Sequence, residues 1–382
     1  MTTDPATATR GHGHILARDT NMTATTTGPS IGFEARAYQS YVLGLKLFWT
    51  TKLYRDVVAQ AQRLGLEDPE AIEERMRQST TYQFFGWLER HLQQYKYLGR
   101  WGMLPITAAQ AEQLSSMLAE AATRHPERLQ LDPQLQMPAY YTDTDFHQHP
   151  GGVWSDDSDA FMYEWAAGST TPTHADNADL HVRLARLIRD RFRPASILDL
   201  GCGFGKTTLP LKREMPDVEV IGCDLSAPVL RLAHMRALEH GLDITFTQQD
   251  AEALRFPDSR FDVVTATMLI HEIPTPVLRR SFAEARRVLK PGGSVVYLDF
   301  YDVPGGAVGE FFHLGHSDRN NEPFMRSLKK LDLVAELKSA GFDDVQIEPF
   351  EEVDGALANG DDPPSAWRFP WTTIVGTVKR DG

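Results

Sequence analysis

The segment Ser196–Gly205, which reads Ser-Ile-Leu-Asp-Leu-Gly-Cys-Gly-Phe-Gly, constrains the fold of this chain more than any other. A short apolar run ends in an acid, and three glycines follow at alternate positions. Short apolar runs of this kind are typical of buried parallel strands. Because glycine has no Cβ, the backbone can turn sharply there and a ligand can approach its peptide groups closely. The pattern predicts a strand that leads into a ligand-binding turn.

Three kinds of ligand are compatible with a glycine-rich turn after a strand. A P-loop needs Gly, four residues and then Gly-Lys-Ser/Thr. Gly205-Lys206-Thr207 is present, but Leu200 occupies the position of the first glycine. A dinucleotide site needs Gly-x-Gly-x-x-Gly, whereas the third glycine here comes one residue too early. Asp199 would also repel a pyrophosphate, but it suits S-adenosylmethionine (SAM), which has no phosphate and carries an ammonium and a sulfonium.

Two later apolar runs also end in acids. Val218–Asp224 ends 19 residues after Gly205, which is near the spacing of about 20 residues expected for a ribose-binding acid in a doubly wound sheet. Ile244–Asp250 ends in another acid. Each acid alone is equally typical of a helix cap or a loop, but their joint occurrence favours a nucleoside site. Three further blocks follow in order: Phe261–His271, Arg287–Asp299 and Ser339–Phe342.

These blocks resemble the motifs of the class I SAM-dependent methyltransferases, and the resemblance covers about residues 178–380. Within that family, the small-molecule C- and O-methyltransferases of the ubiquinone/menaquinone, sterol and tocopherol type are the most similar. The resemblance implies an α/β fold with a seven-stranded Rossmann-like sheet in the order 3-2-1-4-5-7-6, and SAM as the cofactor. The cofactor-binding residues that it implies are Asp199, Gly201, Gly203, Gly205, Asp224, Leu225, Asp250, Ala251 and Met268.

The N-terminal half has the apolar spacing of helices. We expect a helix over 33–66, a second from an N-cap at Asp68-Pro69-Glu70 toward Tyr97, and a third from a capping box at Thr107–Gln110 to about Arg124. The chain is therefore expected to have four parts: a disordered tail over 1–30, which includes His12 and His14, a helical lid or dimerisation domain over 31–137, a loop-like connector and lid over 138–177, and the methyltransferase domain over 178–382.

Composition limits the partners. The formal net charge of −13 disfavours a nucleic-acid substrate, because phosphate binding needs a basic surface. The chain has no run of about 18 apolar residues, so no transmembrane helix is expected. The first 30 residues contain no apolar core and are not expected to be a secretory signal. The two cysteines, Cys202 and Cys223, predict no disulfide framework, and a cytoplasmic location is the default expectation.

Aromatic residues are dense between Thr81 and Trp101. At helical spacing they are more typical of a core than of a substrate pocket, and a homodimer interface is a third interpretation. The expected acceptor is a small apolar or aromatic molecule. In the connector, Asp145, His147 and His149 would share one face of an extended segment, either as ligands of Fe(II) or Zn(II) or as a polar loop. We expect no metal.

Two residues are candidates for catalysis. Phe161–Ser169 is similar to the Tyr-Glu-x-x-x-Gly stretch that precedes the SAM domain of sterol and tocopherol C-methyltransferases, which implies that Tyr163 lies near the methyl group. His271 ends an apolar run and titrates near neutral pH, so it is either the general base or a support for its loop. Glu272 is a second candidate base. The insertion after the fifth strand is expected to cover the pocket with Phe311, Phe312, His313 and His316.

The sequence thus predicts an enzyme that transfers the methyl group of SAM to carbon or oxygen of a small molecule by in-line displacement. Two alternatives remain open at this point. One is a SAM-binding protein that does not transfer the methyl group, and the other is a protein methyltransferase that docks its partner through the helical domain.

Overall fold

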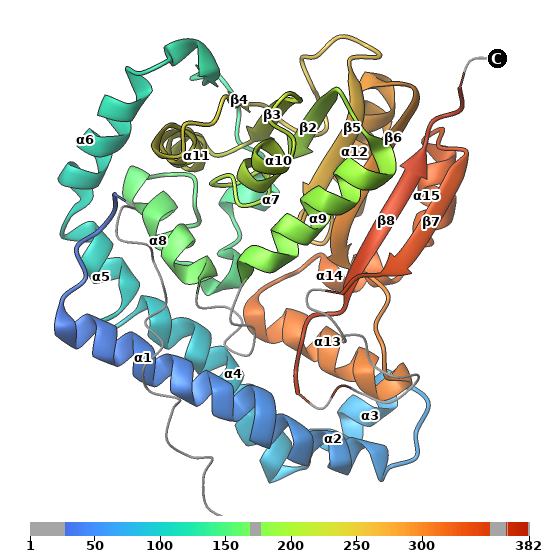
Figure 1. The fold of residues 1–382 in the computed structure, drawn as a ribbon. Coiled ribbons are helices and arrows are strands. Elements are labelled where there is room, and N and C mark those ends of the chain that lie inside the picture. The colour runs from blue at the N-terminus through green and yellow to red at the C-terminus, as the bar shows by residue number, and fades with distance from the viewer. Residues whose placement is uncertain (1–26, 169–176, 352–363, 365, 381–382) are drawn as a thin grey trace, which may run out of the picture.

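The computed structural model describes residues 27–168, 177–351, 364 and 366–380, and it shows a group of N-terminal helices beside an α/β part built on one sheet (Figure 1). Most of the predicted tail, including His12 and His14, lies outside the described residues. Residues 27–30 contact the folded chain, because the Ser30 N–H donates to Gln110 Oε1 at 2.7 Å. Among the described helices, none is both long and apolar enough to cross a membrane.

The sheet has eight strands in the order β1-β4-β3-β2-β5-β6-β8-β7. Strands β1 to β6 pair in parallel, and β8 is antiparallel to both of its neighbours. Without β1, the order is the predicted 3-2-1-4-5-7-6, so the fold class is confirmed. The strands are β1 Leu129–Gln130, β2 Ser196–Leu200, β3 Glu219–Asp224, β4 Thr245–Gln248, β5 Phe261–Thr267, β6 Leu289–Phe300, β7 Asp344–Pro349 and β8 Trp371–Thr377.

The eighth strand, β1, was not predicted from the sequence. It comes from the segment that we expected to be helical, and Leu129 pairs with Phe246 of β4. Two residues carry no readable alternation of apolar and polar side chains, since a strand pattern needs at least four. The division of the chain at residue 137 stays a prediction, although the sheet includes residues on both sides of it.

Alternate residues of the central strands pack on opposite faces of the sheet, as a pleated strand requires. Leu198 of β2 belongs to a core with helices α12 and α15, while Ile197 belongs to a core with α9 and α10. Both faces are therefore covered, which explains the continuous apolar runs that predicted parallel strands. These helices are α9 Asn177–Phe192, α10 Thr208–Glu214, α12 Thr275–Val288 and α15 Leu333–Ser339. The α/β part also contains α11 Ala227–Glu239 and α14 Met325–Lys329.

The N-terminal helices follow the predicted pattern with one division. A nearly continuous helix runs over 33–62, and the Asp68 carboxylate caps α3 by accepting from the N–H groups of Glu70 and Ala71. The helix predicted from Asp68 to Tyr97 is two helices, because the Ser79 side chain provides a second N-cap. The elements are α1 Phe33–Phe48, a π-helix Trp49–Leu53, α2 Tyr54–Gln62, α3 Pro69–Met76 and α4 Thr80–Tyr97.

The capping box predicted at Thr107–Gln110 is wrong. Thr107 lies inside α5 (Met103–Ala108), where its hydroxyl donates to the Met103 carbonyl oxygen at 3.2 Å. Helix α6 (Ala111–Ala122) begins after Gln110 without a side-chain cap. Threonine can donate to a carbonyl of the preceding turn as well as accept at a cap, and here the first geometry is formed.

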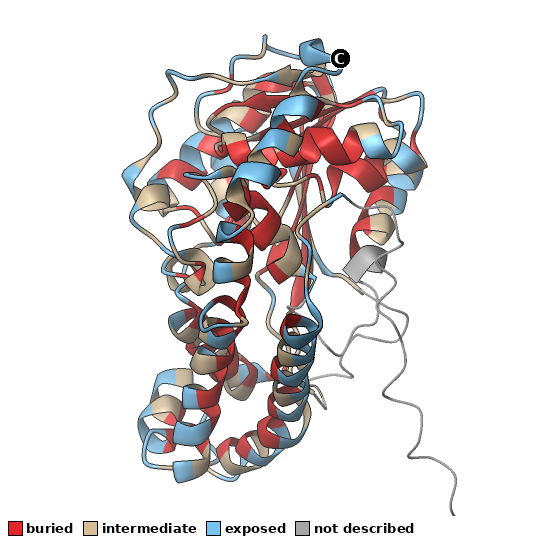
Figure 2. Ribbon diagram, turned by 90° about the vertical axis from the view of Figure 1, so that its left-hand side faces the viewer, coloured by how far each residue is buried: buried red, intermediate tan, exposed pale blue. Residues whose placement is uncertain are grey.

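Helix α13 (Gly306–Asn320), inserted between β6 and β7, joins the α/β part to the N-terminal helices. Phe311 and Phe312 share one buried core with Trp49, Tyr54 and other residues of α1 to α4. Figure 2 shows this arrangement as helices with buried inner faces and exposed outer faces. The two phenylalanines therefore hold the parts of the molecule together and are not among the residues that line its main pocket.

Candidate active site

The turn after β2 needs its glycines. Gly201, Gly203 and Gly205 have φ values of +62°, +51° and +86°, in the left-handed region that side chains other than glycine rarely adopt. A Cβ on Gly205 would also lie 2.2 Å from Leu209 Cδ1 in α10. Gly201 and Gly203 line the main pocket of the molecule, whereas Gly205 does not. Gly205 instead allows α10 to pack close to the turn.

Two of the predicted acids lie at the same edge of the sheet and line this pocket. Asp224 ends β3, and its carboxylate accepts from the N–H groups of Gly203 and Ser226, both at 2.9 Å. Asp250 follows β4 and accepts from the Glu252 N–H at 3.0 Å. Burial raises the pKa of both carboxyl groups. The pocket is also lined by the other residues predicted here, Leu225, Ala251 and Met268.

Asp199 lies behind the turn and does not line the pocket. Its side chain is 1% exposed and accepts a hydrogen bond from Thr208 Oγ1 at 2.6 Å. Burial raises the pKa of its carboxyl group to about 7. Asp199 thus ties β2 to the start of α10, and its contact with a cofactor stays a prediction.

A helix covers the turn in the segment that we expected to be loop-like. Asp156 and Asp159 form a capping box at the start of α8 (Asp157–Ala167), so the run of acids there marks a helix N-terminus. Tyr163 of α8 packs edge-on against Phe204, with ring centroids 5.3 Å apart. A Cβ on Gly203 would lie 3.5 Å from the Tyr163 ring. Tyr163 therefore lines the pocket directly above the glycine turn.

His271 lies in a turn beyond β5, which ends at Thr267. Met268 begins this turn with a left-handed φ of +57°, a strained conformation that is common at functional sites. The His271 Nδ1 donates to Asp299 Oδ1 at 2.5 Å, and its Nε2 has no hydrogen-bond partner among the described residues. Burial disfavours the charged imidazole, but Asp299 and Glu272 outweigh it and raise the pKa of His271 to about 9.

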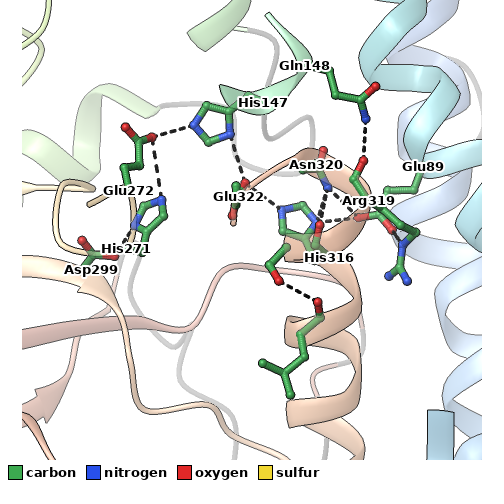
Figure 3. Close-up of polar contacts among 12 residues, drawn as sticks. Glu89, His147, Gln148, His271, Glu272, Asp299, His316, Arg319, Asn320 and Glu322 are labelled. Carbon is green, nitrogen blue, oxygen red and sulfur yellow. Dashed lines mark hydrogen bonds and ion pairs between the residues drawn. The ribbon is translucent and has the colours of Figure 1, made fainter. Parts of the chain in front are cut away.

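A second histidine comes to the same place from the connector (Figure 3). His147 Nε2 lies 2.8 Å from Glu272 Oε1, and its Nδ1 lies 3.0 Å from Glu322 Oε1. Burial opposes its charge, yet the two carboxylates raise the pKa of His147 to about 10. In return, His147 holds the pKa of the buried Glu322 carboxyl at about 2. The His147 imidazolium therefore bridges two carboxylates.

The chain of acids and bases continues to the N-terminal helices. Glu89 of α4 accepts hydrogen bonds from Arg319 and from Asn320, the latter at 3.1 Å, and lies 2.5 Å from His316 Nδ1. His316 Nε2 is in turn 3.8 Å from Glu322. The polar network thus runs from β6 to α4 through hydrogen bonds and two longer ion-pair contacts, and Figure 3 shows its members side by side.

The predicted Asp145, His147 and His149 set does not form. His147 and Gln148 have left-handed backbones, with φ of +52° and +55°, which break the extended geometry that the prediction assumed. His149 turns away and packs against Tyr97, with ring centroids 5.0 Å apart. Over the residues that the structure describes, no three His, Cys, Asp or Glu side chains are placed to hold a metal ion.

One continuous pocket joins the glycine turn to the N-terminal helices. His271, Glu272 and Glu322 line it, and of the four predicted α13 residues only His316 does. The aromatic segment 81–101 is divided: Tyr97 lines the pocket, Tyr82 and Phe85 are core, and Phe84, Trp87 and Tyr95 are exposed. Lining residues that the sequence did not indicate are Lys46, Trp49, Glu89, Lys96, Lys206 and Glu322.

Part of this chain is similar to known methyltransferases. A family model described as a methyltransferase domain matches residues 197–293. The demethylmenaquinone methyltransferase of Thermus thermophilus is 40% identical over 116 residues, which are 30% of this chain and 52% of that protein. The ubiquinone/menaquinone biosynthesis C-methyltransferase UbiE of Bdellovibrio bacteriovorus is 36% identical over 107 residues, 28% of this chain and 45% of that one.

Two further matches involve other acceptors. The malonyl-[acyl-carrier protein] O-methyltransferase of Herminiimonas arsenicoxydans is 32% identical over 169 residues, 44% of this chain and 59% of that protein. A solved structure of Haemonchus contortus phosphoethanolamine N-methyltransferase 2 in complex with SAM is 21% identical, with a TM-score of 0.43, over 59% of this chain and 57% of that one. The chain spans about half the length of the curated relatives it matches.

The matched segment 197–293 contains the glycine turn, both pocket acids and the strand before His271. Together with the strand order, it identifies a class I methyltransferase domain, as the motifs predicted. The cofactor of this domain is SAM.

The residues around the turn fit that cofactor. SAM presents cationic groups, one carboxylate and a ribose diol, and the lining offers the acids Asp224 and Asp250 and the amine of Lys206. Burial lowers the pKa of Lys206 to about 8. The missing Cβ of Gly203 leaves space beneath the Tyr163 ring.

Proposed function

We propose that this protein transfers the methyl group of SAM to carbon or oxygen of a small, apolar or aromatic molecule. The observation that carries the proposal is the continuity of the pocket. Predicted cofactor residues at the glycine turn, His271, which is held by the buried Asp299, and several aromatic side chains all line this one pocket. Such a concave, mostly apolar space with a few convergent polar groups is typical of small-molecule sites.

Each lining residue has a role in this proposal. Asp224 accepts the ribose hydroxyls through the lone pairs that its two backbone hydrogen bonds leave free, and Lys206 meets the carboxylate of the methionine part. When bound, SAM supplies an electrophilic methyl group on a sulfonium. Tyr163 covers the turn and keeps water away from it, and its phenol stays protonated because burial raises its pKa.

We propose that His271 is the general base that removes a proton from the acceptor. Asp299 holds the Nδ1–H of the imidazole, so that Nε2, which is buried and has no hydrogen-bond partner among the described residues, carries the lone pair when the ring is neutral. This is the arrangement by which an acid orients a histidine base. Glu272, whose Oε1 lies 3.9 Å from His271 Nε2 and 2.8 Å from His147, acts through these two rings and not on the acceptor directly.

The function is tested by incubating the full chain with methyl-labelled SAM and a cell extract that has been separated into small molecules and proteins. We expect label in a small-molecule product. Label in a protein band alone would favour a protein substrate, and tight SAM binding without any labelled product would contradict methyl transfer.

Replacing Asp224 by asparagine is expected to weaken SAM binding about 10- to 100-fold, since hydrogen bonds to a charged acceptor contribute about 1.5–3 kcal/mol. Isothermal titration calorimetry with SAM measures the change. The matched control is Asp217→Asn, an exposed acid just before β3, which should leave the affinity unchanged. Equal affinity in both variants would remove Asp224 from the cofactor site.

We also propose a homodimer through the N-terminal helices. Phe84, Trp87, His91 and Tyr95 form a row of ring contacts along α4, in which the first two contacts are stacked and the third is tilted, and Trp87 is 48% exposed. Exposed aromatic rows mark interaction surfaces. The chain's charge of −13 opposes binding to an anionic membrane, and the occupant that we propose is a second copy of this chain.

Trp87→Ser is expected to shift the protein from dimer to monomer in light scattering coupled to size-exclusion chromatography. The control is Arg90→Ser on the same helix, which should stay dimeric. A wild-type chain that is monomeric at concentrations of about 100 μM, where even a weak Kd populates the dimer, would refute the interface.

A further inference from the structure

The part of the pocket built by the N-terminal helices carries two lysines, Lys46 on α1 and Lys96 on α4. Lys96 is 5% exposed, and its Nζ lies over the Tyr97 ring, 4.8 Å from the centroid. Neither lysine amine makes a hydrogen bond or an ion pair with any residue in the described ranges. Lys96 is thus buried and Lys46 is half-buried, and neither amine has a carboxylate partner within the described ranges.

The two charges act on each other. Burial lowers the pKa of Lys46 to about 8, although Glu89 opposes the change. Burial and the charge of Lys46 lower the pKa of Lys96. Glu89 does not serve as their counter-ion, because its carboxylate is already held by His316 and Arg319. An unpaired ammonium inside a protein is costly, so this pair is suited to an anion that enters the pocket.

Flat apolar surfaces surround the same space. The rings of Trp49 and Trp367 meet edge-on, with centroids 6.3 Å apart. The backbone N–H of Trp367 donates to the Thr50 carbonyl oxygen, which places this late segment against the N-terminal helices. Such ring faces receive a planar aromatic body. Tyr97, Phe369 and Trp371 are further aromatic residues that line the same pocket.

We propose that Lys46 and Lys96 form a carboxylate subsite and that the methyl acceptor is an aromatic acid. This inference rests on the proposed function, because it names the chemistry of the acceptor for the same pocket. A carboxylate accepts a charge-assisted hydrogen bond from each lysine. The anion fixes one end of the acceptor at the N-terminal helices, while His271 lines the α/β part of the same pocket.

The test compares 4-hydroxybenzoate with its neutral analogue 4-hydroxybenzamide, by calorimetry on the full chain. We expect the wild type to bind the acid at least about tenfold more tightly, and Lys96→Met and Lys46→Met each to lose about 10- to 100-fold for the acid with no change for the amide. Lys52→Met, an exposed lysine in the π-helix, is the matched control and should change neither affinity.

Thermal unfolding gives a second readout that does not depend on affinity. Removing a buried unpaired amine should leave the Tm of Lys96→Met equal to or above that of the wild type, and 4-hydroxybenzoate should raise the Tm of the wild type alone. Equal binding of acid and amide, no detectable binding of the acid, or an unchanged acid affinity in both variants overturns the subsite. SAM affinity is measured on the same samples, so a protein that binds SAM but does not prefer the acid refutes this inference and leaves the proposed function standing.

Discussion

His271→Asn is expected to lower turnover by about 10²- to 10⁴-fold, the usual contribution of a general base, with no change in SAM affinity. The asparagine amide can still donate to Asp299, so the loop keeps its support while the proton acceptor is lost. Turnover is measured on the acceptor found with labelled SAM, and SAM affinity by calorimetry. The exposed His240 provides the control variant His240→Asn, which should behave as the wild type. Near-normal turnover of His271→Asn would show that the ring only supports its loop.

The pH profile separates these two roles further. The pKa of His271 near 9 means that the ring is mainly protonated at neutral pH, so the rate should rise with pH until about 9. Asp299, Glu272 and Glu322 are the carboxylates that raise this pKa, while burial opposes them. Glu272→Gln removes one of these charges and should move the rising limb to lower pH. A profile that is flat between pH 6 and 9, in both proteins, contradicts the assignment of His271 as base.

The second large effect is on stability. Glu89→Gln should reduce the free energy of unfolding by about 3–5 kcal/mol, because the buried Arg319 then loses its counter-ion. Urea denaturation measures the change. Asp318→Asn on the same helix breaks an exposed ion pair with Arg326 and should cost at most about 1 kcal/mol. A loss below about 1 kcal/mol for Glu89→Gln would mean that the network does not depend on its acid.

This effect should depend on pH in a defined direction. Burial tends to raise the pKa of Glu89, but Arg319 and His316 outweigh it, and the pKa lies below its ordinary value of 4.5. A lowered folded-state pKa gives stability that is present above the unfolded pKa and is lost as the pH falls through the folded pKa. The difference between wild type and Glu89→Gln should therefore shrink below about pH 4.5. The double variant Glu89→Leu/Arg319→Met, which removes both charges, should recover much of the loss.

The sequence predicted those parts of the site that depend on neighbouring residues. The glycines after β2 are needed by their own backbone conformation. Asp224 ends β3 and Asp250 closely follows β4, so spacing along the chain was sufficient to find them. The strand order followed from the same blocks. Even there, Asp199 proved to lie behind the turn, because a motif indicates where a residue stands in the chain and not which way its side chain points.

The missed parts depend on contacts between distant residues. His147 meets Glu272 and Glu322, which are 125 and 175 residues away, and no spacing rule links such positions. The pattern Asp-x-His-x-His suggested one shared face, but the left-handed backbone at His147 turned the two rings apart. Lys46 and Lys96 resembled ordinary charged positions on amphipathic helices, and only the folded arrangement brings them into one pocket with the late segment at Trp367.

Through the short strand β1, the N-terminal half also covers one edge of the sheet. By pairing with β4, Leu129 and Gln130 cover the edge of the sheet that β4 would otherwise form. Exposed edge strands can pair with other chains and promote aggregation. A catalytic fragment that began at Pro138 would keep every predicted cofactor residue and the pairing of β4 with β3, but it would leave the outer edge of β4 unpaired. The N-terminal helices that line the pocket therefore belong to a segment that also covers this edge of the sheet.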